Sequence, residues 1–138
     1  MLTTGFRVAL GIFVLRVAAG GMMLFSHGWS KLTGFEKLKD VFPDPLGIGS
    51  TLSLVSAVGA EVGCSALLIL GIFTRWAAIP LAFTMGVAIF IVHAADPWAK
   101  KELAALYLAM YVMLAFTGGG AYQLETPIRR KLRAGAGS

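Results

Sequence analysis

Long apolar segments constrain the fold of this chain more than any other feature of its sequence. A transmembrane helix needs about 20 mostly apolar residues, and four segments of roughly that length can be marked off along the 138 residues. With 57% hydrophobic residues, 14% charged residues and a mean hydropathy of +0.78, the chain is too apolar for a soluble domain. We therefore predict an all-α integral membrane protein that forms an antiparallel four-helix bundle.

Glycine, proline and short polar clusters separate the predicted spans. Between the first two spans, Phe35, Leu38, Val41 and Phe42 alternate with charged residues, a pattern typical of a short helix that lies in the membrane interface. We place the spans at about residues 8–32, 50–73, 76–95 and 102–117, within one domain over residues 1–128. Residues 129–138 are predicted to form a disordered basic tail.

The basic residues indicate lipid headgroups rather than nucleic acid as partners. Twelve Lys and Arg outnumber seven Asp and Glu, and several of the basic residues lie next to predicted spans, at Arg75, Arg129, Arg130, Lys131 and Arg133. Four spans place both termini on one side, and the slight basic excess on that side favours cytoplasmic termini. The single cysteine, Cys64, excludes an intrachain disulfide.

Arg16 lies inside the first apolar run, where a charge is costly and needs a partner. On a helix that advances 100° per residue, Arg16, Gly20, Met23, His27 and Lys31 follow one stripe. Counted from the side of the termini, Arg16 lies about 12 Å deep and Glu61 of the second span about 16 to 18 Å deep. We therefore predict that Arg16 pairs with Glu61, either as part of a site or as a structural ion pair that fixes helix register.

A second layer, near the opposite, outer face of the membrane, is predicted to hold His27, Lys31, His93 and Glu102. The two histidines lie at the same depth, about 25 to 29 Å from the side of the termini, and could transfer protons, bind a ligand or simply donate to carbonyls. Haem ligation by both histidines is disfavoured, because they lie near the mouth and nothing else indicates a haem pocket. A zinc site would need a further ligand, for which only Glu102 is available.

These residues resemble the motifs of the DoxX family of small four-helix membrane proteins. The resemblance rests on Arg16 with Gly20, His27-Gly28-Trp29-Ser30-Lys31-Leu32, Glu61 with Gly63, Leu70-Gly71-Ile72-Phe73-Thr74-Arg75, His93 and Glu102. The chain departs from the family pattern at Gly118-Gly119-Gly120 and Leu124-Glu125, where Gly-Pro-Gly followed by Ser-x-Asp is common, and at Cys64, where a second glycine is frequent.

The resemblance implies a redox-linked function in a prokaryotic inner membrane. The family is similar to the membrane subunit of thiosulfate:quinone oxidoreductase, and DoxX-like proteins are linked to complexes that handle thiols, sulfur species and oxidative stress with soluble partners. The implied site has His27, His93 and Glu61 as catalytic residues and Arg16, Lys31 and Glu102 as substrate-binding residues. No redox centre is evident within the chain, so we expect electrons to come from a redox partner protein or directly from the substrate. The expected ligand is a quinone or a small sulfur or thiol substrate, in a polar pocket that opens to the outer face, and we also expect a capacity to form homo-oligomers. The alternative is a non-catalytic membrane adaptor or assembly factor whose polar cluster is structural.

Overall fold

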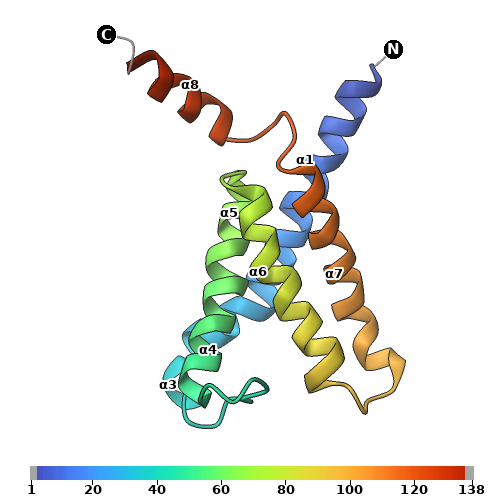
Figure 1. Cartoon of the computed structure of the whole chain (residues 1–138), viewed down its shortest axis with the longest axis vertical. Coiled ribbons are helices and arrows are strands. Elements are labelled where there is room, and N and C mark those ends of the chain that lie inside the picture. Colours follow the sequence, from blue (N-terminus) through green and yellow to red (C-terminus); the bar gives the residue numbers. More distant parts are fainter. Residues whose placement is uncertain (1–2, 136–138) are drawn as a thin grey trace.

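The computed structural model describes residues 3–135, which form helices joined by loops, with no strand in that part of the chain (Figure 1). Three helices are long and apolar enough to cross a membrane by length and composition, and they cover Thr4–Thr33, Ser50–Leu70 and Thr74–Val92. The predicted all-α fold with long apolar helices is therefore confirmed.

Each of these three helices contains a π-helical segment, labelled η. In chain order the elements are α1 (Thr4–Met23), η1 (Leu24–Gly28), α2 (Trp29–Thr33), α3 (Phe35–Leu38), α4 (Ser50–Val58), η2 (Gly59–Cys64), α5 (Ser65–Leu70), α6 (Thr74–Val87), η3 (Ala88–Val92), α7 (Trp98–Thr117) and α8 (Glu125–Gly135). The first long helix is α1–η1–α2, the second is α4–η2–α5 and the third is α6–η3. π-helical turns are rare and often occur at functional sites, and η2 contains Glu61.

Local sequence explains where the helices begin and end. Thr3 caps α1, since its hydroxyl accepts a hydrogen bond of 3.3 Å from the backbone N–H of Phe6. The second long helix ends at Gly71, whose φ of +71° is left-handed and suits a residue without Cβ. These two signals set where the first long helix begins and where the second one ends, both at the end of the molecule where the N-terminus lies.

Asp44 organises the loop that leads into α4. Its carboxylate accepts hydrogen bonds from the backbone N–H groups of Ile48 (2.9 Å) and Gly49 (2.8 Å) and from the Ser53 hydroxyl (2.8 Å). These bonds lower the pKa of Asp44, and the bond from Gly49 has the largest effect. The loop is thereby tied to the first turn of α4.

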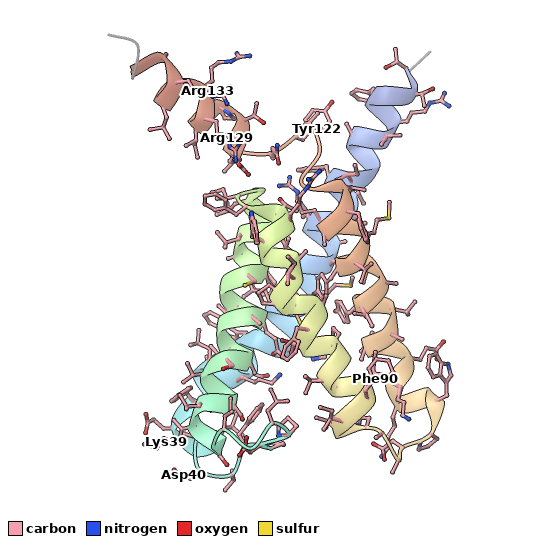
Figure 2. The ribbon with its side chains drawn as sticks, in the orientation of Figure 1. Lys39, Asp40, Phe90, Tyr122, Arg129 and Arg133 are labelled. Carbon is pink, nitrogen blue, oxygen red and sulfur yellow. The ribbon has the colours of Figure 1, made fainter. Side chains whose placement is uncertain are left out.

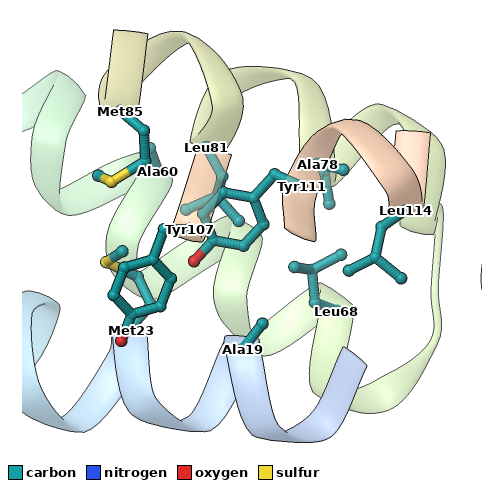
Figure 3. Packing of buried hydrophobic residues seen from close by; sticks show 11 residues of the cluster. Ala19, Met23, Ala60, Leu68, Ala78, Leu81, Met85, Tyr107, Tyr111 and Leu114 are labelled. Carbon is teal, nitrogen blue, oxygen red and sulfur yellow. The ribbon is translucent and has the colours of Figure 1, made fainter. Parts of the chain in front are cut away.

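The first and second long helices approach each other closely at two glycines. A Cβ on Gly20 would lie 3.0 Å from the carbonyl oxygen of Ser65, and one on Gly28 would lie 2.8 Å from that of Glu61. Because the later residue of the first helix meets the earlier residue of the second, the two helices run in opposite directions. Helix α1 also packs on α7, and α7 packs along α6. The shared core contains Met23, Leu68, Leu81, Tyr107 and Tyr111, among others (Figure 3).

The helix bounds differ from the predicted spans at several ends. The second helix stops at Leu70 instead of residue 73, the third covers Thr74–Val92 instead of 76–95, and α7 starts at Trp98 instead of residue 102. The predicted interfacial helix at 35–42 is a single turn, α3, followed by turns. Helix α7 has Lys100, Lys101 and Glu102 near its start, so it is less uniformly apolar than the other three.

Helix α8 occupies the stretch where the sequence predicted a disordered tail from residue 129. It extends to Gly135 and leaves the packed helices at the end where α1 begins, while residues 136–138 lie outside the described range (Figure 1). An ion pair of 2.6 Å between Arg129 Nε and Glu125 Oε1 supports its first turns. Leu124, Ile128 and Leu132 follow each other at helical spacing among basic residues, which makes α8 amphipathic.

Candidate functional site

An ion pair between Lys31 and Glu61 connects the first two long helices. Lys31 Nζ lies 2.6 Å from Glu61 Oε2, and it also approaches the carbonyl oxygen of His27 at 3.5 Å. The side chain of Glu61 is 6% exposed and that of Lys31 is 22% exposed. The pair forms because Gly28 allows η1 to contact η2, which places Lys31 within reach of the carboxylate.

The Lys31–Glu61 pair lines a cavity of about 390 Å³ between the second and third long helices. Most of its wall is apolar and comes from residues such as Ala57 and Ala60 of the second helix and Phe83 and Ala88 of the third. The loop around Leu46 contributes to the wall as well. A mostly apolar cavity with a few polar groups on its wall is the usual form of a small-molecule site.

The structure does not form the predicted pair between Arg16 and Glu61. Arg16 is 1% exposed, its Nη2 donates a hydrogen bond to the carbonyl oxygen of Tyr122, and its guanidinium lies 5.5 Å from the centre of the Phe13 ring. Within residues 3–135, its Nε and Nη1 have no hydrogen-bond partner. Arg16 thus fixes the loop after α7 instead of facing the cavity.

The reason for this difference is the register between the first two helices. Helix α1 begins about three turns before Arg16, and those turns extend past the end of the second helix (Figure 1). Arg16 therefore lies level with Gly71, where a Cβ would overlap its Nη1. The depth estimate assumed that both helices reach the same level, and it therefore placed Arg16 too close to Glu61.

The remaining predicted site residues are not gathered around the ion pair. The His27 ring packs edge-on against Tyr107 at 5.9 Å between ring centres, and His93 Nδ1 lies 2.7 Å from Asp96 Oδ2. Glu102 is exposed, and no ion pair is formed by it within the described range. Of the six predicted residues, only Lys31 and Glu61 form an ion pair with each other in the described part of the chain, and His27 meets Lys31 only through its backbone carbonyl.

Three aromatic rings form a row beside the ion pair. Tyr107 stacks on Tyr111 with 5.8 Å between ring centres, and the His27 ring makes an edge-on contact with Tyr107. Figure 3 shows the two tyrosines among the buried side chains of the core. The Tyr111 hydroxyl is buried and has no hydrogen-bond partner within residues 3–135. Tyr111 therefore contributes a stacking contact to the core.

Sequence reasoning missed the partner of His93. Asp96 follows His93 by three residues, and this short spacing could have indicated the contact. The hydrogen bond from His93 is the main cause of a lowered pKa at Asp96. No group of three or more His, Cys, Asp and Glu side chains in the described part of the chain is placed to hold a metal ion.

Long apolar helices, a buried ion pair and a mostly apolar cavity define a helical membrane protein with a candidate small-molecule site. Residues 11–94 match the family model of DoxX, and the chain belongs to this family of integral membrane proteins. The matched region includes Arg16, His27, Lys31, Glu61 and His93 and ends before Glu102.

Two proteins from Haemophilus influenzae are similar to this chain. One is 40% identical over 91 residues, which cover 61% of this chain and 67% of the relative. The other is 28% identical over 107 residues, which cover 74% of this chain and 71% of the relative. Both are described only as uncharacterized proteins. No solved structure shows a significant match to the chain.

Proposed function

We propose that this DoxX protein binds a quinone in the cavity beside Lys31 and Glu61 and serves as the membrane subunit of a redox system. The supporting observation is the buried ion pair on the wall of a mostly apolar cavity of about 390 Å³. A quinone ring suits the apolar wall, while its carbonyl oxygens can accept a hydrogen bond from Lys31 Nζ. Glu61, hydrogen-bonded to the same ammonium, is placed to exchange a proton with the reduced ring.

The electrons in this proposal come from thiols, directly or through a partner protein. Two thiols lose two electrons and two protons and form one disulfide, and the quinone gains both to become a quinol. Lys31 and Glu61 line the cavity, whereas His27 and His93 make separate contacts with Tyr107 and Asp96. We therefore assign the proton-exchange function to Glu61 and leave the two histidines outside the quinone site.

In the same proposal, α7 is a fourth crossing and completes an antiparallel bundle. Helix α7 has 20 residues, about 30 Å, and its apolar part packs along α6 and α1. The lysines near its start are long enough to reach the interface. The basic residues around α8 then favour cytoplasmic termini in a prokaryotic inner membrane.

Binding of decylubiquinone to the purified protein in detergent tests the proposal. Ala57 lines the cavity, so Ala57→Leu fills part of it without changing a charge, and we expect at least about tenfold weaker binding from the lost space. Lys31→Gln should also weaken binding. Ala18→Leu, at an exposed position of α1 that does not line the cavity, is the matched control.

Equal binding by wild type, Ala57→Leu and Ala18→Leu would contradict the quinone site. One observation favours the non-catalytic adaptor as the second candidate: His27, His93 and Glu102 do not converge on the ion pair. Absence of quinone binding, together with a stable co-purifying protein, would support that alternative.

A further inference from the structure

A second cavity lies at the end of the molecule where α8 leaves the packed helices. This cleft has a volume of about 810 Å³ and is bounded by the first turn of α6, the end of α7 and one side of α8. It shares no lining residue with the cavity beside Lys31 and Glu61. Whatever it binds is therefore independent of the proposed quinone site.

The charge of this cleft is strongly positive. Four arginines line it, Arg75 from α6 and Arg129, Arg130 and Arg133 from α8, against one carboxylate, Glu125. Glu125 is already paired with Arg129 at 2.6 Å. Within residues 3–135, Arg75, Arg130 and Arg133 form no ion pair, so three guanidinium groups are available to an anion. Figure 2 shows Arg129 and Arg133 at the end opposite Lys39 and Asp40.

A buried hydroxyl without a partner is a second, independent indication of a ligand. Thr74, at the start of α6, lines the cleft and is 2% exposed, and its Oγ1 has no hydrogen-bond partner in the described part of the chain. Buried polar atoms normally have a partner. The hydroxyl faces Gly119, where a Cβ would lie 2.7 Å from it and would overlap Gln123 Oε1. The absence of a side chain at Gly119 therefore keeps this polar corner of the cleft open.

The remaining features of the cleft select the kind of anion. Helix α6 has 14 residues and directs its N-terminal end, with its partial positive charge, toward the cleft, where the N-cap N–H of Phe73 donates a hydrogen bond of 3.2 Å to Glu125 Oε2. Arginine binds phosphate oxygens through paired N–H groups. Phe73 and Trp76 also line the cleft, with 54% and 74% of their surfaces exposed, and exposed aromatic rings are typical of the membrane interface.

We propose that this cleft binds a phosphate group, with Arg75 and Arg130 as the main ligands and Thr74 at the floor. An anionic phospholipid headgroup and a free phosphate ester share this chemistry. The exposed rings of Phe73 and Trp76 and the amphipathic α8 favour the lipid, because its acyl chains would extend along apolar surface beside its headgroup.

Native mass spectrometry of the full chain, purified with equal amounts of phosphatidylglycerol and phosphatidylcholine, tests this proposal. The wild type should retain phosphatidylglycerol in preference. Arg75→Gln combined with Arg130→Gln should lower that retention at least about fivefold, since two charge-assisted contacts are lost. Arg133→Gln, on exposed α8, should lower it less and cannot disturb the packed helices. Arg7→Gln is the matched control, because Arg7 is exposed on α1 and does not line the cleft.

The outcomes separate the two sources of phosphate. Release of the retained lipid by millimolar inorganic phosphate, or thermal stabilisation by phosphate that the double variant lacks, would support the phosphate site and indicate a soluble ligand. Equal loss of lipid in Arg7→Gln would indicate general charge attraction and overturn the proposal. Retention unchanged in the cleft variants, with no effect of phosphate on the wild type, would overturn it as well.

Discussion

Removing Lys31 from the Lys31–Glu61 pair should destabilise the protein more than removing Glu61. Lys31→Met leaves a carboxylate that is 6% exposed beside a mostly apolar cavity, so we expect a loss near the lower end for a broken buried pair, about 3 kcal/mol. Glu61→Gln leaves an ammonium that is 22% exposed and can turn to water. The glutamine oxygen also still accepts a hydrogen bond, which limits the expected loss to about 1 kcal/mol.

The double variant Lys31→Met/Glu61→Gln leaves neither charge unpaired. It should therefore lose about 2 kcal/mol, less than the sum of the single losses, which is a coupling of about 2 kcal/mol. Reversible unfolding of the purified protein by increasing fractions of SDS in dodecyl maltoside, followed by circular dichroism, measures all four free energies. Equal losses in the two single variants, or a double variant that loses the full sum, would refute the reasoning.

The chain offers a matched control for this cycle. Lys39 and Glu36 form an ion pair of 2.7 Å, but their side chains are 38% and 80% exposed. An exposed pair contributes at most about 1 kcal/mol and often much less. Lys39→Met and Glu36→Gln should therefore change the free energy of unfolding by about 0.5 kcal/mol or less each.

Three further predictions concern backbone contacts, the loop before α4 and the attachment of α8. Gly28→Ala should cost about 1 to 3 kcal/mol in the same unfolding assay, because the Cβ meets Glu61, whereas Gly63→Ala has open space and should be neutral or slightly stabilising. The lowered pKa of Asp44 contributes stability above the ordinary aspartate pKa of about 3.9, and that stability is lost as the pH falls through the lower pKa of the folded state. Melting temperatures between about pH 2.5 and 6 should therefore depend less on pH in Asp44→Asn than in the wild type. Arg16→Gln should release the loop at Tyr122 and speed tryptic cleavage after Arg129 and Arg130, with cleavage after Lys37 as the internal control.

The sequence was sufficient to predict the helices but not how far each extends past its neighbour. Apolar runs mark the helices clearly, and Gly34 and Gly71 mark two of their ends. The level of Arg16 depends on how many turns of α1 extend beyond the second helix, and no local signal gives that number. It is decided by the close contacts at Gly20 and Gly28, which involve residues about 33 to 49 positions away in the chain.

The same limit applies to the candidate site. Glu61 and Lys31 were recognised because ionisable residues in apolar runs need partners, yet the sequence paired the carboxylate with the wrong cation. The cleft beneath α8 was missed, because the basic residues beyond residue 128 were interpreted as a disordered anchor. Only the fold brings Arg75 of α6 to the same cleft as those residues.

The π-helical segment η1 explains why the predicted stripe fails at His27. Along α1 the buried residues Arg16, Gly20 and Met23 follow the expected spacing of three or four. The next buried residue is Gly28, five positions after Met23 and not four, as expected when a π turn adds one residue. This extra residue turns the buried face from His27 to Gly28. As a result the imidazole contacts Tyr107 and the backbone at Gly28 meets η2. The close contact at Gly28 thus follows from an irregularity that a regular helical spacing cannot reveal.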